Sequence, residues 1–302
     1  MLIGHTNSIT QSKFSSDEIY LLSSSKDNCV KLWKPSLILN PENSLKKTPL
    51  LKTYSSLHSN TITDIEIYND NSKFITSSND KSICLVDSFS SKVIKRYLHH
   101  FNAVHSIHLN EEFNILISGS SDMSAKIIDI NSKDVIQHLK EATDSITTVN
   151  FNSKNNLIIT SSIDGYLRIY DIRKNKLASI NCHNSICDFD ISFNSKYICV
   201  SCMNNTIHLI ELETFNEIST FSNEHKCETF IMKTQFDPND KGILTTSENG
   251  KIILYDYNKT SNCLYNANDN NNSPYEIITT CIDSKQKATA IGLSNGNIFT
   301  MI

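Results

Sequence analysis

Seven copies of one short pattern predict that this chain folds as an all-β propeller with seven blades, each built from four antiparallel strands. In every copy an Asp or Asn follows a run of small residues, and an aromatic or apolar residue comes six positions later. Successive turn residues lie 53, 42, 42, 40, 45 and 46 residues apart, close to the length of chain that one four-stranded blade needs. The turn residues are Asp27, Asp80, Asp122, Asp164, Asn204, Asn249 and Asn295.

The stretch SSIDGYLRIYDIR, residues 161–173, illustrates how one copy predicts local structure. Asp164-Gly165 is a tight-turn dipeptide, and Tyr166–Ile172 is apolar on both faces, as expected of a strand buried on both sides. Three copies carry Asn in place of the turn Asp, and Asn also tolerates a tight turn. We name the four strands of a blade a to d from the centre outward, so this stretch is the b–c turn and strand c of blade 4.

The repeats fill the chain, so we expect residues 1–302 to form a single domain. The last copy ends at its third strand, so we expect Met1–Ile3 to supply the missing strand and close the ring without an open sheet edge. Two connections carry extra residues: Lys34–Leu50 between strands c and d of blade 1, and Asn268–Pro274 before blade 7. We expect both to be solvated loops, with a functional insertion as the alternative for the first.

The composition is that of a soluble globular protein that binds other proteins. Hydrophobic residues make up 39 % and the net charge is −4, which argues against a dedicated nucleic-acid binder. No apolar stretch is long enough for a signal peptide or a membrane span. The nine cysteines are irregularly spaced, so we expect reduced thiols and a cytoplasmic or nuclear location.

The period of the copies and the four strands expected for each resemble those of WD40 repeats. That resemblance implies a buried tetrad of His before strand a, Ser on strand b, Asp in the turn and Trp on strand c. Blade 1 matches all four positions with His5, Ser25, Asp27 and Trp33. Blades 2 and 3 lack the aromatic residue but keep His58, Ser78, Asp80 and His100, Ser120, Asp122. Because these His and Asp residues recur at blade spacing, a structural role is favoured over a catalytic pair.

Other chemistry has little support in the sequence. The CVSC stretch, Cys199–Cys202, is a lone CxxC on a predicted strand, where residues three apart point to opposite faces. No second pair at zinc spacing and no phosphate-binding or hydrolase motif accompanies it. We therefore expect no enzyme activity, no catalytic residue, no metal and no cofactor.

Three positions per blade are expected to surround the top of the central channel: two at the start of strand a and one before the turn. In blades 4–7 these positions are more apolar than in blades 1–3, although solvent is expected there, and an exposed apolar cluster is typical of a protein interface. The alternative is that Phe230 and Met232 plug the channel mouth. The predicted contact residues are Ile163, Met203, Phe230, Met232 and Ile278, with the polar residues Lys26, His105 and Glu248.

Longer phrases resemble the mitogen-activated protein kinase organiser family, also called WD repeat-containing protein 83. They include LNEEFNILISGSSD, VIQHLKEATDSITTV and SSIDGYLRIYDIRKNKL, and the likeness covers nearly the whole chain. This resemblance implies a scaffold without catalysis, a monomer within larger assemblies. Its implied partners are spliceosomal components in pre-mRNA splicing or members of a MAP-kinase cascade, in the nucleus and the cytoplasm.

A different role is suggested by the stretch Tyr170–Arg173, which fits the WDxR box of some propellers. That box docks on the adaptor of cullin-RING ubiquitin ligases, and Arg173 beside Asp171 would form charge-assisted bonds to the adaptor. A structural strand-end pair is the alternative for these two residues. A ligase substrate receptor is therefore the second function to consider.

Overall fold

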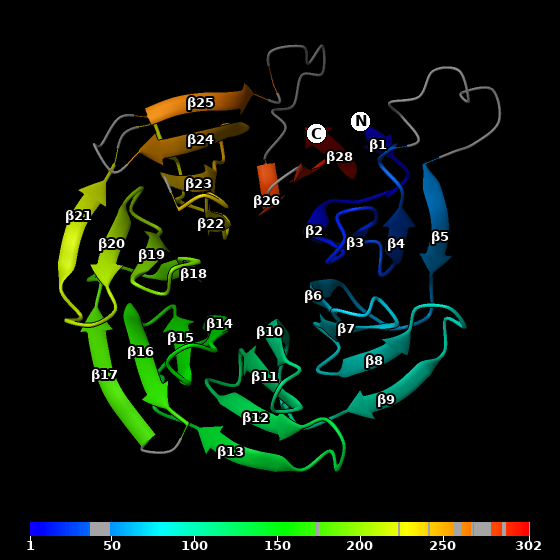
Figure 1. Ribbon diagram of the computed structural model, residues 1–302, viewed down its shortest axis with the longest axis horizontal. Helices are drawn as coiled ribbons and strands as arrows, with labels where there is room; N and C mark the ends of the chain where they lie inside the picture. The colour runs from blue at the N-terminus through cyan, green and yellow to red at the C-terminus, as the bar shows by residue number, and fades with distance from the viewer. Residues whose placement is uncertain are drawn as a thin grey trace.

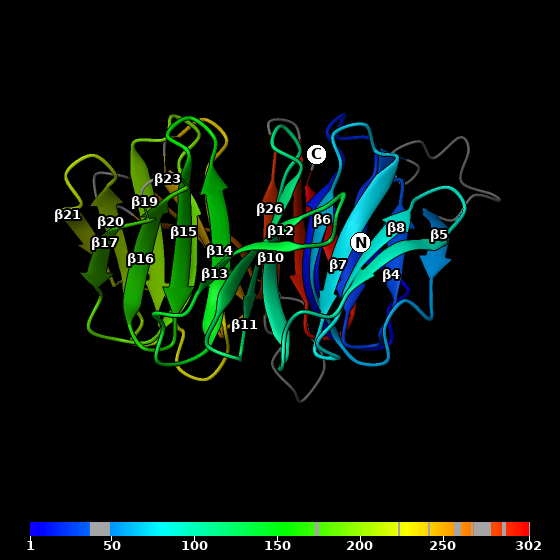
Figure 2. The same ribbon diagram turned by 90° about the horizontal axis from the view of Figure 1, so that it is seen from below.

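The computed structural model contains seven four-stranded antiparallel sheets that follow one another once around a central axis, as Figure 1 shows. It describes residues 1–36, 49–172, 175–222, 224–240, 242–256, 261–266, 268, 279–285 and 288–301. Seen from the side, the strands run between two opposite faces of a disc (Figure 2). The predicted all-β, seven-bladed propeller with four antiparallel strands per blade is confirmed.

The first four blades are formed by β2–β17, taken in chain order. Blade 1 contains β2 (Ile9–Phe14), β3 (Leu21–Ser25), β4 (Val30–Trp33) and β5 (Leu50–Tyr54). Blade 2 contains β6 (Ile62–Ile67), β7 (Lys73–Ser78), β8 (Ile83–Asp87) and β9 (Val93–Tyr97). Blade 3 contains β10 (Val104–Asn110), β11 (Ile115–Ser120), β12 (Ala125–Asp129) and β13 (Val135–Leu139). Blade 4 contains β14 (Ile146–Asn152), β15 (Leu157–Ser162), β16 (Tyr166–Asp171) and β17 (Asn175–Asn181).

The last three blades complete the ring and include the N-terminal strand. Blade 5 contains β18 (Ile186–Ile191), β19 (Tyr197–Cys202), β20 (Ile207–Glu211) and β21 (Glu217–Phe221). Blade 6 contains β22 (Thr234–Phe236), β23 (Gly242–Thr246), β24 (Lys251–Asp256) and β25 (Ser261–Asn266). Blade 7 contains β26 (Thr279–Ser284), β27 (Thr289–Leu293), β28 (Asn297–Met301) and β1 (Leu2–Ile3).

Each blade buries both faces of its middle strands against its neighbours. Strand β11, with the sequence ILISGS, is buried at every position, whereas the outer strand β9 exposes Val93 and Ile94. One core cluster joins Leu22 of blade 1 to Phe74 of blade 2. A strand that is buried on both faces carries a continuous apolar run rather than alternating apolar and polar residues. This burial explains the apolar runs that the repeats show in the sequence.

The seven b–c turns share one backbone conformation. The residue directly after each turn Asp or Asn has a φ between 62° and 83°. This left-handed region favours Gly and Asn, and five of the seven positions carry one of these two residues. Lys81 and Met123 occupy it in blades 2 and 3, so the hydrogen bonds of Asp80 and Asp122 must hold those turns against local strain.

The N-terminal strand closes the ring, as the sequence predicted. Strand β1 pairs antiparallel with β28, with Leu2 opposite Ile298 and Ile3 opposite Asn297. Leu2 is fully buried in a cluster that also contains Trp33 of blade 1. The termini therefore meet in one sheet, as the labels N and C in Figure 1 indicate.

Polar side chains on the inner strands connect each blade to the next. The Asp283 carboxylate of blade 7 accepts the backbone N–H of Phe14 in blade 1 at 2.6 Å. Asp64 of blade 2 accepts the N–H of Ile107 in blade 3 at 3.0 Å. These bonds satisfy inner-strand donors that have no further strand to pair with.

The two long connections lie where the sequence placed them. The first joins β4 to β5 of blade 1, and the second joins β25 to β26 before blade 7. Residues 37–48 and 269–278 lie outside the described residues, so the expectations for the loops at 34–50 and 268–274 stay predictions.

Leu2→Ala should lower the free energy of unfolding by about 2–5 kcal/mol, because it leaves a cavity in the sheet that joins the two ends of the chain. Ile3→Ala is the matched control, since Ile3 is 71 % exposed on the same strand. The control should change stability by less than about 0.5 kcal/mol. Urea unfolding followed by circular dichroism measures both, and equal effects would contradict the role of β1 in closure.

Candidate functional site

Blade 1 contains the polar network that the repeat pattern predicted, with one residue changed. His5 Nδ1 donates to Asp27 Oδ2 at 2.8 Å, and the same carboxylate accepts the backbone N–H groups of Thr6 and Cys29. The Ser23 hydroxyl lies 2.8 Å from His5 Nε2 and accepts the Trp33 indole N–H at 2.8 Å. Every polar group of the network has a partner, which a buried network requires.

The prediction that Ser25 is the Ser of the tetrad is wrong. Ser25 Oγ donates to the Asn7 carbonyl at 2.9 Å and accepts the Asp27 N–H, so it braces the turn. Ser23 and Ser25 point to the same side of β3 because side chains alternate along a strand, and only Ser23 lies deep enough to reach the imidazole. The same two-residue shift replaces Ser78 by Thr76 in blade 2 and Ser120 by Ser118 in blade 3.

Blade 4 braces its turn with a residue that the sequence analysis missed. Arg168 of β16 donates two hydrogen bonds to the Asp164 carboxylate, at 3.1 and 2.7 Å. Burial raises the pKa of Asp164, but the Arg168 hydrogen bonds and backbone N–H groups outweigh burial and lower it to about 2. A charged residue inside the apolar run YLRIYD was the signal that could have identified Arg168.

In blades 5–7 the turns rely on local hydrogen bonds. Asn249 Oδ1 accepts the Lys251 N–H at 3.2 Å, and Asn295 Oδ1 accepts the Asn297 N–H at 3.0 Å. His183 is exposed at the surface, whereas His225 is buried between Ser201 and Thr245 at 3.3 and 3.4 Å. Among the described residues, neither His forms a hydrogen bond with its turn Asn, so these blades lack the His–Asp pair of blades 1–3.

The top mouth of the central channel, on the face that carries the b–c turns, is a cavity of about 450 Å³. It is lined by residues from around the ring, including Lys26 and Asn79 before their turns and Thr10, Thr63, His105 and Thr280 on inner strands. None of the described residues that line this cavity is an Asp or Glu. The Thr280 hydroxyl is buried there without a hydrogen-bond partner. The mouth therefore presents several hydroxyl groups, with the positive charge of Lys26 at its edge.

Blade 6 adds an apolar element to this mouth. Phe230 is 50 % exposed and Ile231 39 % exposed, and both line the cavity. The connection that carries them precedes β22, which has three residues where the other inner strands have six or seven. The sequence analysis identified Phe230 but missed Ile231, because it placed these positions on strand a, whereas β22 begins only at Thr234.

Two of the predicted contact residues turn inward, which contradicts their expected exposure. Met232 is 1 % exposed and packs on Cys187 and Cys227. Glu248 is buried, and one of its carboxylate oxygens accepts the backbone N–H groups of residues 228–230 at 2.6–2.9 Å. Glu248 thus shapes the blade 6 connection rather than facing solvent.

The remaining predicted positions are distributed around the same face. Lys26 is exposed, while Ile163 and Met203 are half-buried, Met203 against the cluster that contains Met232. His105 Nε2 lies 2.5 Å from the Ser121 hydroxyl. Ile278 lies outside the described residues.

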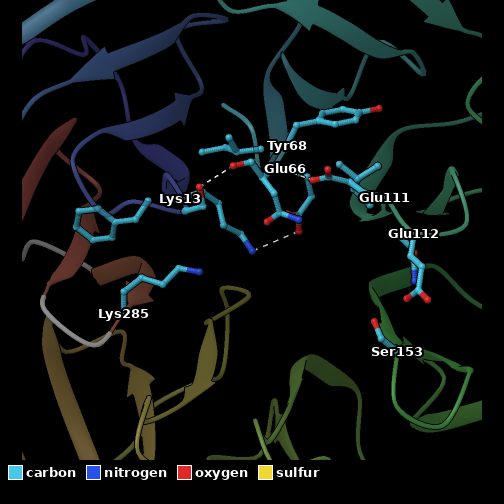
Figure 3. Close-up of a pocket in the computed structure, with 13 residues that line it drawn as sticks. Lys13, Glu66, Tyr68, Glu111, Glu112, Ser153 and Lys285 are labelled. Carbon is cyan, nitrogen blue, oxygen red and sulfur yellow. Dashed lines mark hydrogen bonds and ion pairs between the residues drawn. The ribbon is translucent and has the colours of Figure 1, made fainter. Parts of the chain in front are cut away.

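Below the mouth, charged side chains line the channel. Lys13 and Glu66 form an ion pair at 3.3 Å and point toward one another in Figure 3, beside a second cavity of about 370 Å³ at the opposite end. Lys233 pairs with Asp188 at 3.1 Å, and burial raises the pKa of Asp190 to about 6. Because these pairs join side chains of different blades, they contribute to holding the inner strands together.

The described residues contain no helix that is long and apolar enough to cross a membrane. Nor do they bring three or more His, Cys, Asp or Glu side chains into a group that could hold a metal ion. Cys199 and Cys202 pack in different core clusters, as the alternation of strand faces predicted.

Comparison with known families agrees with this architecture. The family model described as WD domain, G-beta repeat, matches residues 1–34, 49–87, 91–129, 133–171 and 174–211, which is more than half of the chain. The chain therefore belongs to the WD40 repeat family. The comparison with curated proteins found no match.

Ser23→Ala should destabilise the protein by about 1–3 kcal/mol, because it leaves the Trp33 N–H and His5 Nε2 unpaired in the interior. Trp33 is the one tryptophan of the chain, so its fluorescence reports this network directly. Ser25→Ala keeps the indole partner and should leave the emission maximum unchanged. Ser55→Ala, at an exposed position, is the stability control. An emission shift in Ser25→Ala alone would contradict the assignment of Ser23.

The free energy of unfolding should decrease as the pH falls from about 7 to about 5. Burial lowers the pKa of His5, His58 and His100 below 6.5, so the unfolded chain binds protons more readily than the folded ring. These histidines make their full contribution to the free energy of unfolding above their pKa in the unfolded chain. That contribution is lost as the pH falls below this pKa. Urea titrations across this range measure the slope. His100→Gln should reduce the slope whatever its absolute stability, and an unchanged slope would contradict the explanation.

Proposed function

We propose that this protein is a non-catalytic scaffold whose top mouth binds an extended segment of a partner protein. The observation that carries the proposal is the exposed pair Phe230 and Ile231 beside a cavity of about 450 Å³. Apolar side chains next to a polar rim are typical of protein interfaces. WD40 propellers generally act as such interaction scaffolds, and we propose no catalysis, no cofactor and no metal for this one.

The chemistry of the mouth favours a partner segment that combines an apolar side chain with a carboxylate. The absence of Asp and Glu among the described lining residues, in a chain of net charge −4, makes this face complementary to acidic groups. Lys26 is exposed at the edge and supplies the positive charge. Phe230 and Ile231 supply the apolar contact.

For the cellular role, we propose that the protein takes part in pre-mRNA splicing as a spliceosome-associated scaffold, or organises members of a MAP-kinase cascade. The resemblance of the phrases quoted above to the mitogen-activated protein kinase organiser family supports this proposal. The same resemblance supports the proposal that the protein acts in the nucleus and the cytoplasm, as a monomer within larger assemblies. The negative net charge favours docking on proteins over direct binding of RNA.

The second candidate function is a substrate receptor of a cullin-RING ubiquitin ligase. Asp171 ends strand β16 and is half-buried, while Arg173 of the same box lies outside the described residues. Tyr170 packs in the core between blades 3 and 4, so the aromatic position of the box is structural. Under this proposal Arg173→Ala abolishes association with the ligase adaptor.

Affinity purification from nuclear and cytoplasmic extracts, followed by mass spectrometry, separates these roles. Small-nuclear-ribonucleoprotein components would support splicing, and protein kinases would support signalling. Cullin adaptor subunits that are lost with Arg173→Ala would support the ligase role and overturn the first proposal.

Phe230→Ala combined with Ile231→Ala should weaken binding of the recovered partner by about 30-fold or more, as expected when central apolar contacts are removed. Phe89→Ala is the matched control, because Phe89 is 95 % exposed on the opposite face, in the connection between β8 and β9. Isothermal titration calorimetry with the purified partner measures both variants. Loss of binding in Phe89→Ala with retention in the double variant would refute the top mouth as the binding site.

A further inference from the structure

Two cysteines from neighbouring blades meet beneath the top mouth. Cys187 lies at the start of β18 in blade 5, and Cys227 lies in the connection between β21 and β22 that enters blade 6. Their Sγ atoms are 3.0 Å apart, and both residues are fully buried. Because an S–S bond measures about 2.05 Å, joining them needs a movement of only about 1 Å.

Other hydrogen bonds hold Cys227 in this position. Its backbone N–H donates to Asn205 Oδ1 at 2.7 Å, and its Sγ lies 3.4 Å from the Phe230 carbonyl oxygen. Glu248 accepts the next three backbone N–H groups. The connection is therefore held so that one sulfur faces the other across the boundary between the two blades.

The two thiols differ in the direction of their pKa shifts. The hydrogen bond between them lowers the pKa of Cys227 and raises the pKa of Cys187, and nearby His225 lowers the pKa of Cys227 further. The thiolate is the nucleophile in cysteine oxidation. Cys227 is thus suited to react first with an oxidant, and Cys187 is placed to resolve the product.

We propose that Cys187 and Cys227 form a redox-sensitive pair that hydrogen peroxide closes to a disulfide. The Cys227 thiolate attacks one peroxide oxygen, the O–O bond breaks, and a sulfenic acid and hydroxide form. The Cys187 sulfur then attacks the sulfenic sulfur, and its proton leaves with the hydroxyl group as water. Two electrons pass from the thiols to the peroxide, so two thiols and one peroxide give one disulfide and two waters.

The disulfide fastens the connection that carries Phe230 and Ile231 to the inner strand of blade 5. Blade 6 has the shortest inner strand among the described blades, so the bond ties its entry to a longer neighbour. A consequence for partner binding rests on the proposed function, whereas formation of the bond does not.

The test uses the full chain, reduced and then treated with a small molar excess of hydrogen peroxide. After denaturation, the number of thiols that react with N-ethylmaleimide should fall from nine, the number of free cysteines, by the two that form the bond. Non-reducing tryptic digestion should join the peptide of residues 177–196 to that of residues 227–233. Because the first peptide also contains Cys182, the digestion is repeated with Cys182→Ser to assign the bond to Cys187.

Two variants control the experiment. Cys187→Ser should abolish the joined peptides, while Cys263→Ser, which removes an exposed cysteine, should leave them intact. Nine reactive thiols after peroxide treatment, or a bond between Cys182 and Cys202 with residues 227–233 unlinked, would overturn the proposal. Since the readout is covalent, failure of Phe230 and Ile231 to bind a partner would leave this result unaffected.

Discussion

Each sequence repeat contributes strands to two blades, and the rest of the structure depends on this overlap. The family match over residues 49–87 begins with β5 of blade 1 and ends with β8 of blade 2. The same offset places β1 in blade 7, where Leu2 pairs opposite Ile298. The chain therefore runs once around the ring, and its two ends pair antiparallel within blade 7. This pairing leaves no open sheet edge on β28 where the ring closes.

Within that ring, the blades differ in how their b–c turns are held. Blades 1–3 use a buried His–Asp pair, and blade 4 uses the Arg168–Asp164 pair. Blades 5–7 place Asn at the turn, where Asn249 and Asn295 accept a backbone N–H two residues further on. The features that set this chain apart from a regular repeat array lie among blades 5–7. The short strand β22, the exposed pair at Phe230 and the cysteine pair all belong to blades 5 and 6. Departures from local rules commonly mark functional positions, and here they gather at one side of the channel mouth.

The sequence predicted the number of blades and the closure of the ring. It did not predict correctly how deeply individual side chains lie within a blade. Ser23 and Ser25 share one face of β3, so alternation alone cannot decide which of them His5 reaches. The answer depends on how far the His-bearing loop descends into the blade. Likewise, the sequence predicted that Phe230 and Met232 both face the channel mouth, yet the first is exposed and the second packs on Cys187 and Cys227.

The amino-acid sequence by itself determined the blade count, the turn positions and the order of strands. These features follow from local hydrogen bonding at each Asp or Asn turn and from a period that the chain repeats seven times. Only the tertiary structure decided which side chains surround the channel mouth and that Cys187 meets Cys227. Both depend on how one blade packs against the next, and residues 40 positions apart carry no local signal of that contact.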